Sequence, residues 1–328
     1  ADVQITWGFS HDMLTACLGR DRSTAFFPMR GNDRYRIVGV FPEGSDKKEG
    51  EVLYEEIERQ ILEDTQLKLD IYKVNWFSTY KVHSRRVNKF SEGRCFLAGD
   101  SAHIHSPAGA QGMNTGIQDG YNVAWKLAFV LRGDVHPKIL DTYNEERIEI
   151  AKRLLQTTDR FFDLLVNPDW LLSFVRQHIF PHVANFVVGI DAVNQFFFPL
   201  ISQIGIHYRH RTLSLDSGDD FTVQAGDRLP YFLINGASIY DRLHAPSFHL
   251  LTFTNEPADV SPDELKNKFG ALLDCHTVPL NKEISEMFGA SGPFNVLLRP
   301  DNHISMIFAS TSAEPVTAFF TDVLGSTR

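Results

Sequence analysis

An acidic side chain, a glycine-rich loop and a helix follow one another around residue 100. Asp100 ends the run GRCFLAGD, which predicts a turn and a short buried strand with a carboxylate at its tip. The loop over residues 101–112 leads into a helix predicted over residues 113–131. A helix N-terminus offers unpaired N–H groups and a positive dipole end, so it attracts anions and electron-rich carbonyls. Because a strand-end carboxylate suits hydrogen bonds to sugar-like hydroxyls, the segment suits a ligand with a polyol and an anionic ring.

Glycines allow the backbone of this segment to approach a flat ligand. Gly109, Gly112 and Gly116 carry no Cβ that would stand in the way. A structural account stays open beside the functional one, in which Asp100 caps the loop and the glycines only turn it, because short glycine-rich motifs often match by chance. The helix itself is predicted from apolar residues at helical spacing: Ile117, Tyr121, Ala124, Trp125, Ala128 and Leu131.

Two histidines near the acidic residue raise the question of a metal site. His103 and His105 form an H-x-H pattern beside Asp100. This pattern is unspecific without further ligands, and a cofactor-binding segment accounts for the same residues. We therefore expect no metal site.

The segment resembles the second flavin-binding motif of the class A FAD-dependent aromatic hydroxylases, the phenol hydroxylase-like and p-hydroxybenzoate hydroxylase-like monooxygenases. Three stretches carry the resemblance in the family's order: residues 93–103, 107–119 and 122–128. Residues 141–147, DTYNEER, resemble the next signature of the family. Residues 226–230, GDRLP, and 298–303, LRPDNH, resemble the C-terminal thioredoxin-like domain of the phenol hydroxylase branch. The resemblance thus extends over essentially the whole chain.

The resemblance assigns roles to the loop and to the start of the helix. It implies that Asp100 binds the ribitol hydroxyls of FAD and that Pro107 lies beside the reactive edge of the flavin ring. It also implies that the backbone of Gly112, Met113 and Asn114 meets the pyrimidine end of the ring, where the helix dipole stabilises the negative charge of the reduced flavin. Gly109 and Gln111 complete the predicted cofactor-binding residues.

The resemblance also implies an activity and a place for the substrate. Enzymes of this family use FAD, NAD(P)H and O2 to hydroxylate phenolic or other aromatic compounds. Trp76 and Tyr80 alternate on a strand predicted over residues 71–82, which the family places near its aromatic substrate. Packing in the protein core explains these two residues equally well. The alternative function is a non-catalytic fragment or subunit that acts in assembly or oligomerisation.

One part of the family pattern does not occur in the sequence. The family's N-terminal G-x-G-x-x-G strand–turn–helix, which holds the ADP part of FAD, has no counterpart here. The chain begins ADVQIT, without an initiator methionine. We therefore expect the C-terminal part of a monooxygenase, either associated with a missing N-terminal segment or forming a homodimer.

The predicted elements describe a mixed α+β and α/β chain with three parts. Residues 1–82 are expected to form a substrate-binding sheet region, with a strand over 34–41 and a helix over 50–64. Residues 83–205 are expected to be the C-terminal part of an FAD-binding domain with long helices. Residues 206–328 are expected to form the thioredoxin-like domain, which begins with a strand over 207–215. No second cysteine accompanies Cys275, so we expect this domain to be redox-inactive.

Composition excludes several classes of protein. The chain has 328 residues and a formal net charge of −9, which argues against a nucleic-acid or anionic-membrane partner. No stretch of about 18 apolar residues predicts a membrane span. Three well-separated cysteines do not form a disulfide framework, and no signal peptide is visible. We expect a cytoplasmic protein.

Overall fold

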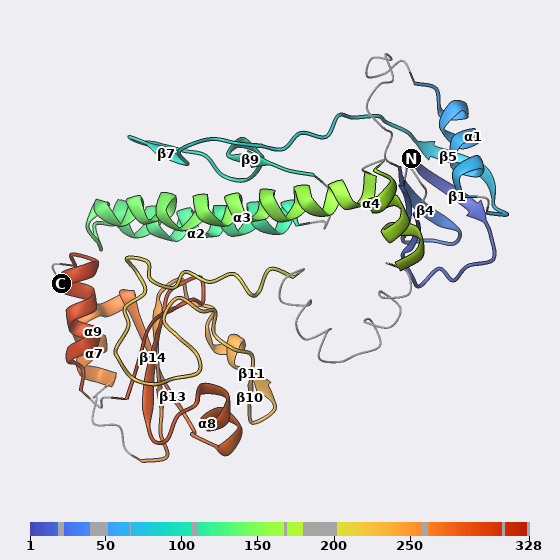
Figure 1. Ribbon diagram of the computed structural model, residues 1–328. Helices are drawn as coiled ribbons and strands as arrows, with labels where there is room; N and C mark the ends of the chain where they lie inside the picture. The colour runs from blue at the N-terminus through green and yellow to red at the C-terminus, as the bar shows by residue number, and fades with distance from the viewer. Residues whose placement is uncertain are drawn as a thin grey trace. The chain divides into compact units, whose positions relative to one another are not determined.

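The computed structural model describes residues 1–18, 23–39, 52–65, 67–106, 111–166, 169–179, 202–256, 262–309 and 312–326. The chain divides into two compact units. Unit 1 contains residues 1–85, 105–109 and 154–196, and unit 2 contains residues 86–104, 110–153 and 197–328. Within the described residues, both units combine sheets with helices, so the expected mixed α/β character is confirmed (Figure 1).

Unit 1 is built on an antiparallel sheet with the strand order β2-β3-β4-β1-β5. Its strands are β1 (Asp2–Thr6), β2 (Thr15–Leu18), β3 (Ser23–Pro28), β4 (Arg34–Gly39) and β5 (Asp70–Trp76). Alternate residues of the central strands are buried, among them Val3, Phe26 and Ile37, and they pack against Ile57 and Ile61 of helix α1 (Tyr54–Thr65). The period-two pattern therefore gives the sheet one covered face and one open face.

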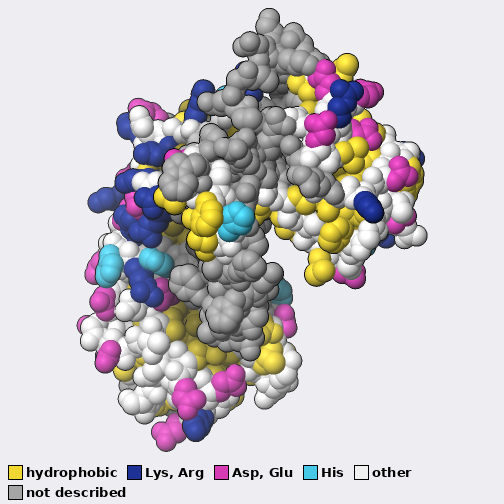
Figure 2. Space-filling view, turned by 45° about the vertical axis from the view of Figure 1, so that its right-hand side comes forward, with side chains coloured by type: hydrophobic (Ala, Val, Ile, Leu, Met, Phe, Trp, Pro, Cys, Tyr) yellow, Lys and Arg dark blue, Asp and Glu magenta, His cyan; other side chains and the backbone are white. Residues whose placement is uncertain are grey.

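Two predictions for unit 1 need correction. The predicted strand over 71–82 ends at Trp76, so Tyr80 lies outside any strand. Core packing of the two aromatic residues is also wrong, because Trp76 is 52% exposed and Tyr80 is 59% exposed. Figure 2 shows hydrophobic side chains on the surface of this part of the molecule. Unit 1 also contains helix α4 (Trp170–Phe174) and the π-helical turn η3 (Val175–Ile179) that follows it.

The two long helices are α2 (Gly112–Leu131) and α3 (Asp141–Val166); α2 and residues 141–153 of α3 belong to unit 2, and the rest of α3 belongs to unit 1. A glycine ends α2. Gly133 has φ +72°, its N–H donates to the carbonyl of Val130 and the N–H of Asp134 donates to Phe129, which is the double hydrogen bond of a Schellman cap. The short 3-10 helix η2 (Pro137–Leu140) then leads directly into α3.

The faces of α2 are not those of an ordinary amphipathic helix. The apolar residues that predicted the helix include three that are largely exposed, Ile117 at 62%, Tyr121 at 51% and Leu131 at 81%. The fully buried residues of the same helix include Asp119 and Lys126. The helix was predicted correctly from its period, but its buried face is partly ionic. Burial of a charge is costly unless the charge is paired, so this face must contain partners.

The C-terminal part of unit 2 is a four-stranded sheet with the order β13-β12-β14-β15. Its strands are β12 (Phe248–Phe253), β13 (Leu273–Val278), β14 (Phe294–Leu298) and β15 (Ile304–Phe308). β12 and β13 run parallel, whereas the other neighbouring pairs are antiparallel. The helices beside it are α7 (Pro262–Phe269), η5 (Gly270–Leu272), α8 (Lys282–Phe288), α9 (Glu314–Ala318) and the π-helical turn η6 (Phe319–Val323).

Apolar clusters cover both faces of this sheet. One cluster joins Phe248 of β12 to Trp125 and Phe129 of α2 and to Phe319 and Phe320 near the C-terminus. The other fills the opposite face. Residues on both sides of the predicted domain boundary near 205 therefore share one core, and the boundary itself stays a prediction.

One predicted strand in unit 2 is wrong. Residues 207–215 form turns instead of a strand, although Tyr208 and Leu213 are buried. Short elements complete the described structure: β6 (Arg85–Arg86), β7 (Ser91–Glu92), β8 (Cys95–Phe96), η1 (Gly99–Ser101), β9 (His103–Ile104), β10 (Leu233–Ile234), β11 (Ala237–Ser238) and η4 (Ile239–Arg242). The expected buried strand before Asp100 is only the short β8, whose Cys95 is exposed.

Candidate functional site

The N-terminus of α2 has no side-chain cap. Gln111 is the N-cap residue, it is 8% exposed, and its side chain makes no capping hydrogen bond. The backbone N–H groups of Gly112, Met113 and Asn114 are the first three of the helix, which have no partner within a helix. The Met113 side chain is 76% exposed. Within the described residues, the Gln111 side chain thus leaves these N–H donors and the positive dipole end uncapped, and such a helix end attracts electron-rich groups.

Asp100 lies in the 3-10 turn η1, which packs directly on α2. The backbones meet at two glycines, and a Cβ on Gly116 would lie 3.3 Å from the Cα of Gly99. Gly99 also has φ +59°, a conformation that a residue with a side chain rarely adopts. Asp100 itself is exposed. The structure thus places the predicted polyol-binding carboxylate on a turn that is fixed against the second turn of α2.

A buried carboxylate on α2 holds this turn in place. Asp119 accepts hydrogen bonds from the Gly99 N–H at 3.1 Å, from His103 Nε2 at 2.8 Å and from Arg147 Nε at 2.6 Å. Burial alone would raise the pKa of Asp119, but the hydrogen bond from His103 and the charge of Arg147 outweigh burial and lower it. His103, which the H-x-H pattern suggested as a metal ligand, is therefore a partner of Asp119 in the described structure.

Arg147 of α3 fixes the beginning of α2 from the other side. Its NH2 group donates to the carbonyl oxygen of Thr115 at 3.2 Å, and its NH1 group donates to the Tyr208 hydroxyl at 2.8 Å. The Thr115 hydroxyl in turn accepts a hydrogen bond from Gln203 Nε2 at 2.6 Å. The first turns of α2 are thus held by fully buried polar contacts, which is how a binding site keeps its geometry.

A second buried ionic cluster lies further along α2. Glu146 of α3 accepts hydrogen bonds from Lys126 Nζ at 2.8 Å and from both terminal nitrogens of Arg299, at 2.6 and 3.0 Å. Arg299 also donates to Asp301 at 2.6 Å, and Asp301 accepts from Trp125 Nε1 at 3.2 Å. The cluster ties both long helices to the C-terminal sheet.

The pKa values in the second cluster follow from burial and pairing. Burial would raise the pKa of Glu146, but Arg299 and Lys126 outweigh it and lower the pKa to about 2. Burial lowers the pKa of Lys126 to about 8, against the opposing attraction of Glu146. Lys126 therefore stays mostly protonated at neutral pH, and the four charged groups of the cluster are mutually compensated.

The buried ionic residues of both clusters were not among the site residues predicted from the sequence. Asp119 lies inside the flavin-type motif, Glu146 and Arg147 lie in DTYNEER, and Arg299 and Asp301 lie in LRPDNH. Local patterns gave no signal for them, because hydrophobicity places Asp119 and Lys126 on the exposed side of α2 and Arg299 and Asp301 follow β14 outside any helix. What they stabilise depends on contacts between segments 16 or more positions apart, which local patterns do not reveal.

The other predicted site residues are distributed as follows. Pro107 and Gly109 lie outside the described residues. Trp76 lies at the end of β5 on the open face of the sheet, where the Arg36 guanidinium is 6.0 Å from the centre of its ring. Arg36 is itself paired with Asp2 at 2.7 and 3.0 Å. Tyr80 lies beyond the strand and is exposed.

Comparison with known proteins agrees with the resemblance of the motifs. The family described as "FAD binding domain" matches residues 2–158. A flavin-dependent monooxygenase of Mycobacteroides abscessus is 38% identical over 182 residues, which is 55% of this chain and 33% of that protein. The 6-methylpretetramide 4-monooxygenase of Streptomyces rimosus is 32% identical over 233 residues, 66% of this chain and 41% of the relative.

Residues 2–158 match the FAD-binding family, and the chain is similar to flavin-dependent monooxygenases. Its fold agrees, because the crystal structure of CabE, an aromatic hydroxylase from angucycline biosynthesis, superposes with a TM-score of 0.72 at 26% identity. That comparison covers 100% of this chain and 64% of CabE. The chain therefore spans between a third and two thirds of the length of these three relatives.

The α2 region offers donors and acceptors that suit a flavin. The uncapped start of α2 offers N–H donors and a positive dipole end to the electron-rich pyrimidine edge of a flavin. The exposed carboxylate of Asp100 lies on the neighbouring turn and can accept hydrogen bonds from ribitol hydroxyls. Across the described residues, no helix has both the length and the apolar character that crossing a membrane requires.

Proposed function

We propose that this protein takes part in the FAD- and NAD(P)H-dependent hydroxylation of a phenolic or other aromatic compound by O2. The observation that carries the proposal is the uncapped N-terminus of α2, positioned against the Asp100 turn by the Gly99–Gly116 contact. Two relatives are named as monooxygenases, of which one acts on 6-methylpretetramide, and this supports the reaction class.

The residues of the chain position and polarise the flavin. FAD, when bound, supplies the transfer of reducing equivalents and the activation of O2. In the proposal, Asp100 accepts hydrogen bonds from the ribitol and fixes the position of the ring. The N–H groups of Gly112, Met113 and Asn114 stabilise negative charge on the pyrimidine end of the ring. Pro107 is proposed to lie beside the reactive edge of the flavin ring, and Gly109 and Gln111 are proposed to contribute to the cofactor-binding loop.

The open face of the N-terminal sheet is the proposed support for the aromatic substrate. Trp76 offers a half-exposed indole ring, and Arg36 and Asp2 place charged groups beside it on the same face. An aromatic compound with a hydroxyl group can stack on such a ring and hydrogen-bond to the neighbouring polar groups. Tyr80 is proposed to contribute from the segment after β5.

The C-terminal sheet is proposed to be a thioredoxin-like domain without redox activity. Its order β13-β12-β14-β15, with one parallel pair and two antiparallel pairs, supports this proposal. Burial raises the pKa of the Cys275 thiol to about 11, so the thiolate needed for disulfide exchange is disfavoured.

Binding of FAD by the purified chain tests the proposal. We expect flavin fluorescence to be quenched on titration with the protein, and Asp100→Ala to weaken FAD binding about tenfold to a hundredfold, because a charge-assisted hydrogen bond is lost. Glu92→Ala, which removes another exposed carboxylate in the same unit, serves as the control and should leave the affinity unchanged. Equal affinity of Asp100→Ala and wild type would refute the assigned role. A chain that binds no FAD would favour the alternative, a subunit that acts in assembly.

A further inference from the structure

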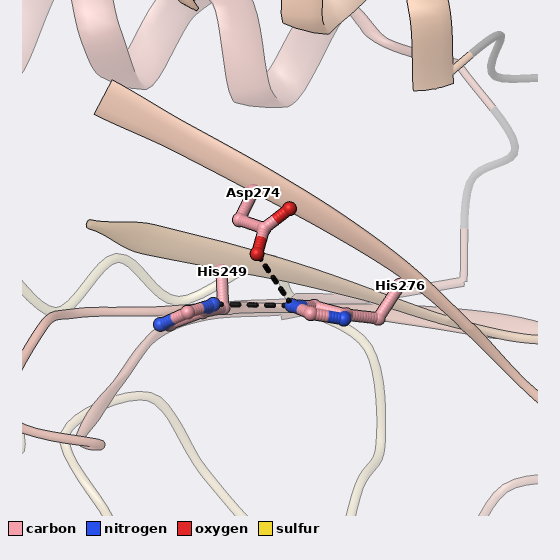
Figure 3. Close-up of side chains that lie close together, drawn as sticks. All are labelled: His249, Asp274 and His276. Atoms are coloured by element: carbon pink, nitrogen blue, oxygen red, sulfur yellow. Dashed lines mark hydrogen bonds and ion pairs between the residues drawn. The ribbon is translucent and has the colours of Figure 1, made fainter. Parts of the chain in front are cut away.

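Three potential metal ligands meet on one face of the C-terminal sheet. His249 lies on β12, and Asp274 and His276 lie on the neighbouring parallel strand β13. In the register of the two strands, His249 is opposite Asp274 and Leu251 is opposite His276. Because side chains alternate along a strand, residues 249, 274 and 276 project from the same face. Figure 3 shows their side chains converging between the two strands.

The distances between the donor atoms match those of ligands around one ion. His249 Nδ1 is 3.1 Å from His276 Nε2, and His276 Nε2 is 3.4 Å from Asp274 Oδ2. All three donor atoms lie within 4.8 Å of one another. Two nitrogens bound tetrahedrally to zinc at about 2.0–2.1 Å are separated by about 3.3 Å. The side chains therefore need only small shifts to coordinate a shared ion.

The surroundings of His249 prepare one ring nitrogen for coordination. His249 Nε2 lies 3.0 Å from the carbonyl oxygen of Ala245, which can only accept a hydrogen bond, so Nε2 carries the proton. The lone pair of Nδ1 then points toward His276. A carbonyl that fixes the tautomer of a histidine in this way is the usual outer partner of a metal-binding histidine.

We propose that His249, Asp274 and His276 form a three-ligand site for a divalent transition-metal ion, with zinc as the best match. Two imidazoles and a carboxylate are a common donor set for zinc, and three protein ligands leave a fourth position for water. The Asp274 side chain is 36% exposed and that of His276 is 14% exposed, which gives the ion a path from solvent. The expectation of no metal site concerned only His103 and His105, and the 25 and 27 positions between His249 and its two partners hide this triad from local sequence patterns.

Two neighbouring features bear on the strength and the identity of the site. The positive charges of Arg242 and Lys266 act on His276, so we expect weaker binding than in a closed four-ligand site. Cys275 lies between two of the ligands in sequence but packs against the apolar cluster on the opposite face of the sheet. It is therefore not a ligand, and zinc binding should not depend on it.

Zinc titration of the full chain, prepared without a histidine tag, tests the site. We expect one Zn²⁺ per chain by calorimetry, a higher melting temperature with Zn²⁺, and visible absorption of the Co²⁺ form typical of tetrahedral coordination. His276→Ala should weaken Zn²⁺ binding by about tenfold or more. Asp274→Asn, a partly exposed substitution of equal size, should weaken it as well and provides a second variant if His276→Ala does not fold.

Two control variants decide between this site and adventitious binding. His244→Ala removes an exposed histidine on the loop before β12, and Cys275→Ser removes the neighbouring thiol. Both should bind Zn²⁺ like wild type. The proposal is overturned if the wild-type chain binds no stoichiometric Zn²⁺, if both ligand variants bind as tightly as wild type, or if either control variant loses binding to the same extent. In these cases the three side chains form a hydrogen-bond network only.

Discussion

Buried carboxylates at two positions, rather than the exposed site residues, organise unit 2. Asp119 joins the η1 turn to α2 and α3, and Glu146 joins both helices to Arg299 beside the C-terminal sheet. A buried charge pair adds little net stability compared with apolar packing, but loss of one partner leaves the other charge uncompensated. These carboxylates therefore act mainly by fixing which segments meet, and their removal should be far more damaging than the removal of a surface charge.

Glu146→Gln tests this at the scale of a single residue. At pH 7 the variant should lose about 3–5 kcal/mol of unfolding free energy, because Arg299 and Lys126 remain buried without their carboxylate. The folded-state pKa of Glu146 is about 2, below its ordinary value of 4.5. An unfolded chain thus binds this proton first as the pH falls, so the stabilisation is complete above 4.5 and is lost as the pH falls toward about 2. Urea unfolding at several pH values measures the difference between wild type and variant.

The control for Glu146→Gln is Glu149→Gln on the same helix. Glu149 is partly exposed and pairs with Arg153 at 3.6 Å, so its loss should change the unfolding free energy by less than about 0.5 kcal/mol. The difference between Glu146→Gln and wild type should shrink as the pH falls below 4.5. A difference that stays constant between neutral and acidic pH would contradict the assigned pairing.

At the scale of elements, the helical spacing of apolar residues predicted where α2 lies in the sequence. It did not predict which face of α2 is buried. The predicted bounds, residues 113–131, differ from Gly112–Leu131 by one residue, and the glycine stop at Gly133 is present. Exposure of Ile117 and burial of Lys126 are the reverse of what hydrophobicity predicts. Residues 207–215 were misread as a strand for a related reason, since their apolar side chains are buried by contacts with distant segments and not by a sheet.

Gly116→Ala tests the contact between α2 and the η1 turn. The new Cβ would lie 3.3 Å from the Gly99 Cα, so the backbone of the turn must shift and take Asp100 with it. We expect a loss of about 1–3 kcal/mol in unfolding free energy from this overpacking, together with weaker FAD binding. Thermal and urea unfolding measure the first effect, and flavin fluorescence measures the second.

Gly120 offers a matched control one turn further along α2. A Cβ there meets nothing within 4 Å. Gly120→Ala should therefore raise helix stability by about 0.5–1 kcal/mol, because alanine loses less conformational entropy than glycine on folding into a helix. If both variants behaved alike, the close approach of Gly99 and Gly116 would not be what positions the turn.

At the scale of the whole chain, the similarity to a flavin-binding family and the mixed α/β class could be predicted from the sequence. The contacts between distant segments of unit 2 could not. The motif residues 93–103, 107–119 and 122–128 indicated a flavin-binding family, and an FAD-binding family matches residues 2–158. The cluster that joins Phe248, Trp125 and Phe320 depends instead on apolar residues that many substitutions could replace. Sequence patterns therefore indicate similarity to a family more readily than they indicate which segments form the core.

The shared core predicts that α2 and the C-terminal sheet unfold together. Phe248 is fully buried, and its ring lies 5.8 Å from Trp125, 5.9 Å from Phe129 and 5.2 Å from Phe320, measured between ring centres. Phe248→Ala should lower the opening free energy of amides in α2 and in β14 by the same amount, about 3–5 kcal/mol. Native-state hydrogen exchange measures both sets of amides in one experiment.

Tyr231→Ala, which truncates a side chain that is 64% exposed, is the control and should leave the opening free energies of both sets of amides unchanged. If Phe248→Ala weakened only the amides of the sheet and left α2 protected as in wild type, helix and sheet would be separate folding units, and the predicted boundary near residue 205 would then mark a cooperative division of the chain.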